Sequence, residues 1–132
     1  MSSSPDPSTP LLMDVGQIAV RAVDLPRAVA FYRDTLELPL LFQVPPGLAF
    51  FQCGSVRLMV SIPEPEFDHP SSILYFTVHD IEVVAARLLD RGVVFRSAPH
   101  AVHKAGAMEL WMGFFADSEG NTLAIMESKT VG

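Results

Sequence analysis

The strongest constraint on the fold is a short pattern that the chain contains twice. A shift of 56 positions superimposes Val23-Asp24-Leu25 on His79-Asp80-Ile81, and each copy follows an aliphatic or β-branched run. An Asp at this place suits a helix N-cap, because its carboxylate accepts hydrogen bonds from the free N–H groups of the first turn. Each copy also opens a stretch of helical apolar periodicity. The sequence therefore predicts a duplicated strand-helix unit.

Composition restricts the class of protein. The chain has 132 residues, of which 49% are hydrophobic and 18% charged, so we expect one globular domain with a real core. The net charge of −6, with nine Lys and Arg in all, argues against a nucleic-acid partner.

No apolar run approaches the ~20 residues of a membrane span, and the first ten residues lack signal-peptide features. The single cysteine, Cys53, cannot form an internal disulfide. We expect a cytoplasmic protein.

The order of predicted elements repeats along the chain. The first half reads as a strand at 15–22, a helix at 25–36 and strands at 38–44, 48–53 and 56–62. The second half reads as a strand at 72–78, a helix at 80–91 and strands at 93–98, 107–115 and 122–127, with a turn at 117–121. Residues 97–106 fit neither strand nor loop clearly. We expect a flexible tail at 1–13 and one domain at 14–128, made of modules 14–62 and 72–128 and a linker at 63–71.

Three motifs in this order resemble a known family. They are the strand-Asp-Leu-x-Arg-Ala-x-x-Phe-Tyr run at 18–32, the strand-x-Asp-Ile-Glu run at 73–82, and the turn Asp117-Ser-Glu-Gly-Asn121. Together they are similar to the vicinal oxygen chelate superfamily, which includes glyoxalase I, bleomycin resistance proteins, extradiol dioxygenases and methylmalonyl-CoA epimerase. The resemblance implies an α+β fold in which two βαβββ modules form a U-shaped eight-stranded mixed sheet, with helices on the convex side and a cleft on the concave side. It also implies a homodimer.

The resemblance places metal ligands on the first and last strands of each module. Those positions correspond to Gln17, Met59, Ile73 and Ala124 in this chain. Divalent ions in such sites take imidazole, carboxylate or amide oxygen, and only Gln17 offers one of these. We therefore predict that the usual metal site is absent and that the protein has no cofactor.

Strand alternation predicts which side chains face the cleft. If Ile18 and Val20 pack under the first helix, Gln17, Ala19 and Arg21 face the cleft, and by the same parity so do Ile73, Tyr75, Thr77, Thr122, Ala124 and Met126. In the strand at 107–115, an acid and an indole share the face of Glu109 and Trp111, a composition typical of a pocket wall. The opposite face is uniformly apolar and is expected to be core. Trp111 would equally suit a dimer interface or the core.

A few polar side chains are candidates for chemistry. Arg21 and Arg57 would favour a carboxylate or another anionic ligand if they are unpaired, or would form structural ion pairs with Glu109. One of His100 and His103, His103 for preference, is a candidate proton donor or anion contact, and Glu109 is a further catalytic candidate. Alternatively, His103 is a loop histidine that is hydrogen-bonded to the backbone. The H-x-x-H spacing of His100 and His103 is only a weak indication of a metal-binding pair. Structural roles are expected for His69 and His79.

These observations leave three functions open. The first is a glyoxalase/bleomycin-resistance-like protein that binds a small, partly apolar molecule, anionic if the arginines are free, in a metal-free cleft. The second is a glyoxalase-like lyase or isomerase with a non-standard site, made either of a metal held by Gln17, His103 and Glu109 or of general acid–base groups alone. The third is an interaction module with an inert cleft. The predicted ligand-binding residues are Gln17, Arg21, Arg57, Met59, Ile73, Tyr75, His103, Glu109, Trp111 and Ala124.

Overall fold

The computed structural model describes residues 10–131. Residues 1–9 of the predicted tail lie outside the described residues, and residues 10–16 are exposed and lack regular secondary structure. No helix in the described part of the chain combines the length and the apolar character that crossing a membrane requires.

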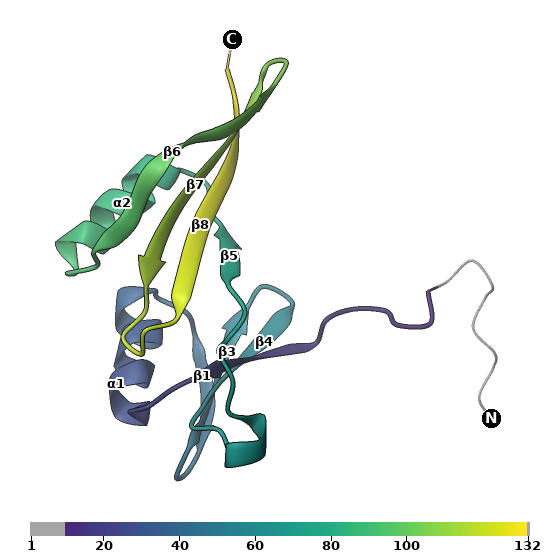
Figure 1. The fold of residues 1–132 in the computed structure, drawn as a ribbon, viewed down its shortest axis with the longest axis vertical. Helices are drawn as coiled ribbons and strands as arrows, with labels where there is room; N and C mark the ends of the chain where they lie inside the picture. The colour runs from purple at the N-terminus through teal and green to yellow at the C-terminus, as the bar shows by residue number, and fades with distance from the viewer. Residues whose placement is uncertain (1–9, 132) are drawn as a thin grey trace.

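Each half of the chain forms one four-stranded mixed sheet with a helix (Figure 1). The first module contains β1 (Gln17–Arg21), α1 (Leu25–Ala30), the π-helical turn η1 (Phe31–Thr35), β2 (Leu40–Val44), β3 (Leu48–Cys53) and β4 (Val56–Ser61), in the sheet order β1-β4-β3-β2. After the 3-10 turn η2 (Pro65–Phe67), the second contains β5 (Leu74–Thr77), α2 (Ile81–Asp90), β6 (Phe95–Ala105), β7 (Met108–Ala116) and β8 (Thr122–Thr130), in the order β5-β8-β7-β6.

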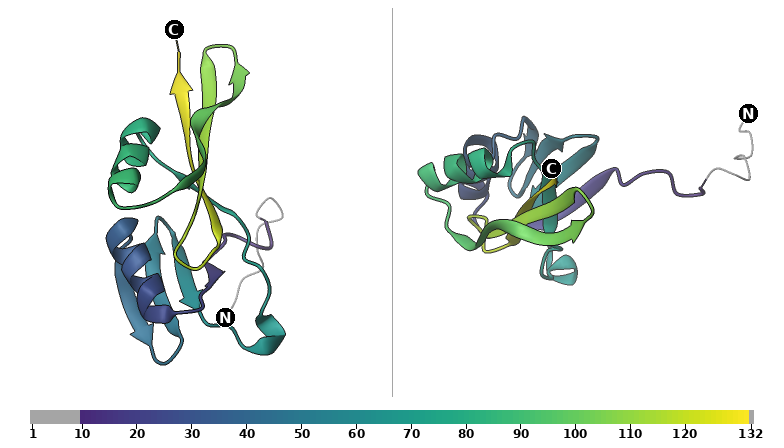
Figure 2. Two further views of the ribbon diagram at one scale, coloured as in Figure 1. Left: turned by 60° about the vertical axis from the view of Figure 1, so that its left-hand side comes forward. Right: turned by 90° about the horizontal axis from the view of Figure 1, so that it is seen from above.

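The predicted fold class is confirmed, because both modules run βαβββ and in each the first strand pairs parallel with the last. The eight strands are divided into two sheets of four. We call these sheet A (β1 to β4) and sheet B (β5 to β8). In Figures 1 and 2 the sheets follow one another along the long axis, and both helices lie on the same side of them. The opposite face of each sheet carries no α-helix, and we call it the open face.

The duplicated aspartates cap the two helices as predicted. The Asp24 carboxylate accepts a hydrogen bond from the Arg27 backbone N–H at 3.1 Å, and the Asp80 carboxylate accepts one from Val83 N–H at 3.3 Å. These bonds satisfy amide groups that a helix leaves free at its start. The two strand-helix junctions are therefore set by local sequence.

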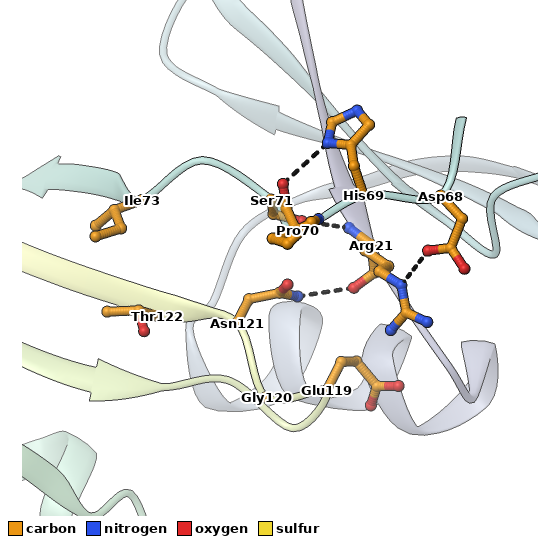
Figure 3. Close-up of a pocket in the computed structure, with 10 residues that line it drawn as sticks. All are labelled: Arg21, Asp68, His69, Pro70, Ser71, Ile73, Glu119, Gly120, Asn121 and Thr122. Atoms are coloured by element: carbon orange, nitrogen blue, oxygen red, sulfur yellow. Dashed lines mark hydrogen bonds and ion pairs between the residues drawn. The ribbon is translucent and has the colours of Figure 1, made fainter. Parts of the chain in front are cut away.

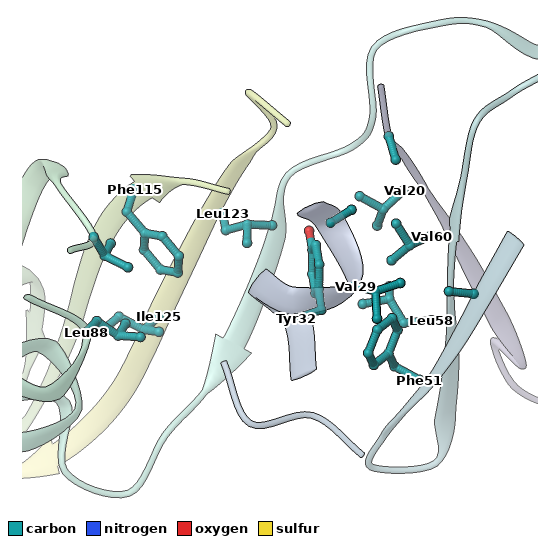
Figure 4. Close-up of a cluster of buried hydrophobic side chains, with 14 of the residues drawn as sticks. Val20, Val29, Tyr32, Phe51, Leu58, Val60, Leu88, Phe115, Leu123 and Ile125 are labelled. Atoms are coloured by element: carbon teal, nitrogen blue, oxygen red, sulfur yellow. The ribbon is translucent and has the colours of Figure 1, made fainter. Parts of the chain in front are cut away.

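The core lies between the helices and the sheets (Figure 4). On sheet A, Val20, Leu58 and Val60 are at most 1% exposed, and on sheet B Phe115 and Leu123 are equally buried. These residues alternate with open-face residues along their strands, as a half-covered sheet requires. Burial of a side chain of this size contributes roughly 1.5–3 kcal/mol to folding.

Most of the segment that the sequence left unassigned, 97–106, belongs to strand β6, which ends at Ala105. Its pairing with β7 shifts register in three places, which accommodates the small residues and Pro99 that weakened the strand pattern. Gly113 on β7 lies against this irregular stretch, and a Cβ there would come within 2.9 Å of Pro99 Cγ. The two strands approach closely because position 113 has no side chain.

The turn between β7 and β8, predicted at 117–121, joins the two modules. Tyr32 of η1 is fully buried and donates a hydrogen bond from its hydroxyl to Asp117 at 2.6 Å. The Asn121 side chain donates to the carbonyl oxygen of Arg21 at 2.7 Å. Gly120 has φ +87°, a conformation that favours glycine. The second module is therefore held to the first through polar groups at this turn.

Glu119 in the same turn reaches the start of α1. Its carboxylate accepts hydrogen bonds from the backbone N–H groups of Val23 and Asp24, both at 2.8 Å, and pairs with Arg27 at 2.8 Å. Burial alone would raise the pKa of Glu119, but these donors outweigh it and lower the pKa to about 2. Glu119 therefore stays ionised between the modules.

Candidate functional site

The open face of sheet A is lined mainly by apolar side chains. Gln17, Ala19 and Arg21 on β1 face away from the core, as predicted. The register between strands places Met59 beside Ala19 and Phe50 beside Met59, so one apolar row crosses the sheet. Phe42 of β2 continues this row and stacks on Phe50, with ring centroids 4.6 Å apart and an interplanar angle of 27°.

The open face of sheet B follows the same alternation. Ile73 and Tyr75 are about half exposed, at 45% and 47%, and Ala124 lies beside Tyr75 in the parallel pair. Phe114 of β7 pairs with Ala124 from the other side, and its ring meets Tyr75 edge to face at a centroid distance of 5.8 Å. Each sheet thus carries one aromatic pair on its open face.

The predicted facing of β7 is wrong. Since Phe114 shares the open face with Ala124, parity turns Glu109 and Trp111 toward the helix side. Lys129 Nζ lies 4.1 Å from the Trp111 ring centroid and pairs with Glu82 of α2. The Trp111 indole N–H donates to Glu109 at 3.0 Å, and this bond, followed by one from Lys104, lowers the pKa of Glu109.

The uniformly apolar face of β7, predicted to be core, is instead the open one. Its members are Met108, Leu110, Met112 and Phe114.

The histidines of β6 lie on the open face of sheet B. His100 pairs with Met112 and His103 with Leu110, so both imidazoles share the face of those apolar residues. Both are exposed. His100 Nδ1 lies 2.8 Å from the carbonyl oxygen of Ala98. The sheet separates His103 from Glu109, because the two residues lie on opposite faces, so these two candidates for proton transfer do not meet in one site.

Three cavities lie along the open face. The largest, about 650 Å³, is on sheet A, and its lining includes Ala19, Leu48, Met59 and Phe67. A second, about 490 Å³, lies where the sheets meet, and a third, about 300 Å³, is on sheet B beside Met126.

The junction cavity is polar (Figure 3). Arg21 lies in its wall and pairs with Asp68 at 2.5 Å, and this bond raises the pKa of Arg21 and lowers that of Asp68. His69 lines both this cavity and the one on sheet A. Arg21 is therefore already paired with a carboxylate of its own chain.

Arg57 has a different environment. Its Nε donates to Gln17 Oε1 at 2.9 Å, and its guanidinium carbon lies 4.9 Å from the Phe50 ring centroid. The ion pairs found among residues 10–131 do not include Arg57. The guanidinium is held by an amide and an aromatic ring, and it is exposed.

The four positions that the resemblance assigns to metal ligands offer few donors. Gln17 Oε1 is already the acceptor for Arg57, and Gln17 Nε2 lies 3.7 Å from Met59 Sδ. Ile73 and Ala124 have no donor atoms in their side chains. Within residues 10–131, no three His, Cys, Asp or Glu side chains come together in a way that could hold a metal ion. This donor set does not fit a divalent cation, which a neighbouring guanidinium would also repel.

Sequence reasoning missed part of this surface. Phe42, Leu48 and Phe50 lie on strands that are apolar on both faces, so alternation gave no reason to choose between their sides. His69 lies in the linker, where strand parity does not apply. Its contribution to two cavities follows only from the path of residues 68–71 along the junction.

Comparisons with known proteins agree with this architecture. The crystal structure of lactoylglutathione lyase from Agrobacterium tumefaciens matches with a TM-score of 0.70 at 22% identity, covering 89% of this chain and 96% of that one. TnmS3, an antibiotic binding protein from Streptomyces sp. CB03234, matches with a TM-score of 0.73 at 21% identity, covering 90% and 98%.

A glyoxalase/bleomycin resistance protein/dioxygenase from Alicyclobacillus acidocaldarius matches with a TM-score of 0.68 at 20% identity, covering 86% and 90%. At these identities the likeness shows the fold alone. No curated protein matches the chain significantly. The family model described as Glyoxalase/Bleomycin resistance protein/Dioxygenase superfamily matches residues 14–125. The chain therefore belongs to the Glyoxalase/Bleomycin resistance protein/Dioxygenase superfamily.

Proposed function

We propose that this protein binds a small, partly apolar molecule on the open face of its sheets, without a metal ion. The main observation is the 650 Å³ cavity on sheet A, which lies in the range of small-molecule sites and has a mostly apolar lining. The stacked Phe42–Phe50 pair lies on the same face. Binding pockets typically combine such apolar walls with a few polar groups, here Ser61, Glu64 and His69. Gln17 and Arg57 lie on the same face beside the cavity.

The donor set at the family's metal positions supports the metal-free form of the proposal. Catalysis in lyases of this kind needs a Lewis acid held by several oxygen or nitrogen ligands. Here one amide oxygen is present, and it already accepts a hydrogen bond from a guanidinium. The fold also occurs in an antibiotic binding protein, TnmS3, which supports small-molecule binding as a use of this architecture.

We further infer that a second copy of the chain covers part of the open face. Phe42, Ile73 and Tyr75 are between 45% and 47% exposed, and Phe67 is 63% exposed. A small ligand would leave much of this apolar surface in water, whereas an isologous dimer would bury it. Sedimentation equilibrium of the purified protein should give twice the chain mass of 14.4 kDa. A monomer at 0.1 mM would contradict the inference.

A neutral fluorescent probe tests ligand binding. N-phenyl-1-naphthylamine should bind saturably, because its fluorescence rises when it enters an apolar site. Leu48→Lys, which puts a charge in the wall of the sheet A cavity, should weaken the affinity about tenfold or more, equivalent to at least ~1.4 kcal/mol. The matched control is Leu89→Lys on α2, where Leu89 is 56% exposed outside the open face. It should change the affinity less than twofold.

The outcomes separate the candidate functions. Unsaturable probe binding, or equal effects of the two Leu→Lys variants, would contradict binding at this cavity. Treatment with a chelator should leave the probe affinity unchanged. One equivalent of tightly bound Ni²⁺ or Zn²⁺ per chain, required for binding, would instead favour the metal-dependent lyase.

A further inference from the structure

The acidic side chains within the strands lie on one side of the sheets, together with Lys104 and Lys129. The two acids that strands β1 to β8 contain, Glu109 and Glu127, both lie on the helix side, since Glu127 pairs with Trp111 and accepts a hydrogen bond from Ile81 N–H. The open face carries Arg21, Arg57, His100 and His103. The carboxylates that line cavities on this face, Glu64, Asp68 and Glu119, come from the segments between strands.

Of the two arginines on the open face, Arg57 is the one without a carboxylate partner among residues 10–131. Arg21 is neutralised by Asp68, whereas Arg57 uses Nε for the Gln17 amide oxygen and makes no ion pair within residues 10–131. An amide acceptor fixes the guanidinium without cancelling its charge. The two Nη groups remain available for a bidentate bond with an anion, the geometry in which arginine binds carboxylates most strongly.

The apolar surface beside Arg57 suits an aromatic ring. Arg57 and Met59 are alternate residues of β4, so both face the open side, and Met59 lines the 650 Å³ cavity. Phe50, over which the guanidinium lies, is buried at 7% exposure and stacks on Phe42, which is 46% exposed. The cation therefore lies beside Phe50, the middle residue of an apolar strip formed by Met59, Phe50 and Phe42.

We propose that the ligand of this site is a planar aromatic carboxylate, whose anionic group binds the Nη donors of Arg57 while its ring lies over Met59 in the sheet A cavity. The inference rests on the proposed function and specifies its ligand class. Gln17 then serves to position the guanidinium. This role explains why a residue at a family metal position has its oxygen turned to an arginine.

Two isosteric competitors test the charge requirement. 2-Naphthoate and 2-naphthamide have the same ring and nearly the same shape, and each would be titrated against bound N-phenyl-1-naphthylamine. The carboxylate should bind at least tenfold tighter than the amide in the unaltered protein. A charge-assisted bond of this kind contributes about 1.5–3 kcal/mol, which corresponds to roughly 10- to 150-fold.

The variant Arg57→Gln should reduce the carboxylate-to-amide affinity ratio to about one. Arg57→Lys should retain an intermediate ratio, because it keeps the charge but loses the bidentate geometry. The matched control is Arg33→Gln, which removes an arginine that pairs with Asp34 in η1. It should leave the ratio above tenfold.

Failure of this inference differs from failure of the proposed function. Saturable probe binding with a ratio near one, or a ratio that Arg57→Gln leaves intact, would overturn the carboxylate assignment alone. Absence of saturable probe binding would overturn the binding function itself. A ratio above tenfold that depends on Arg57 supports both.

Discussion

Replacing Tyr32 by phenylalanine tests how the two modules are held together. The Tyr32 ring is fully buried, and its hydroxyl donates to Asp117 Oδ2 at 2.6 Å. Burial raises the pKa of this hydroxyl, and the Asp117 charge raises it further, so the proton stays on Tyr32 at any ordinary pH. The substitution removes one hydrogen bond to a buried carboxylate and leaves the ring in place.

The cost follows from the partners that remain. Asp117 keeps bonds from the backbone N–H groups of Glu119 and Asn121 and from the Asn121 side chain, each at 2.8 Å. The Asp117 carboxylate therefore loses one hydrogen bond and keeps three. A hydrogen bond to a charged group contributes about 1.5–3 kcal/mol. We expect the free energy of unfolding to fall by about 2 kcal/mol and Tm by roughly 5–10 °C.

The other tyrosine provides a matched control. Tyr75 is 47% exposed, and its hydroxyl has no hydrogen-bond partner within residues 10–131. Tyr75→Phe should change the free energy of unfolding by less than about 0.5 kcal/mol. Urea denaturation followed by circular dichroism at pH 7 measures both variants. Equal losses, or a loss below 0.5 kcal/mol for Tyr32→Phe, would refute the view that this bond joins the modules.

Two further changes follow from the junction and from β7. The pKa of Glu119 is lowered from 4.5 to about 2, which stabilises the folded state by on the order of 3 kcal/mol when the carboxyl is ionised. This stabilisation is present above pH 4.5 and is lost as the pH falls toward 2. Glu119→Gln should therefore flatten the acid side of a curve of Tm against pH, and an unchanged curve would contradict this. Gly113→Ala should destabilise the protein by about 1–3 kcal/mol in urea denaturation, because the added Cβ would lie 2.9 Å from Pro99 Cγ. In the matched control Gly16→Ala the added Cβ meets no atom within 4 Å, so this variant should have little effect.

The parts of the fold that depend on local rules were predictable. Asp24 and Asp80 cap their helices, and residues 117–121 form a turn, because cap and turn chemistry needs only a few neighbouring residues. The repeated pattern then gave two modules, and the fold class followed from their order. The sheet alternation of β1, β5 and β8 was also predicted correctly.

The facing of β7 was not predictable by the same reasoning. Alternation divides a strand into two faces but does not say which face is covered. The methionine-rich face of Met108 and Met112 resembles a core by composition, yet it is the open one. Trp111 and Glu109 resemble a pocket wall by composition, but they lie on the helix side, where the Lys129 ammonium lies over the Trp111 ring and near the Glu109 carboxylate. Only the pairing of Phe114 with Ala124 decides between the two.

The first turns of both helices donate hydrogen bonds to carboxylates of the β7–β8 hairpin. Besides their own aspartates, the first amides of α1 bond to Glu119, and Ile81 N–H of α2 bonds to Glu127. Asp24 and Glu119 are 95 residues apart, so at 5–20 residues per second a ribosome needs roughly 5–20 s to deliver the second after the first. The amino-terminal half thus emerges during synthesis with its helix incompletely capped, and it reaches full stability only when the last hairpin has been made.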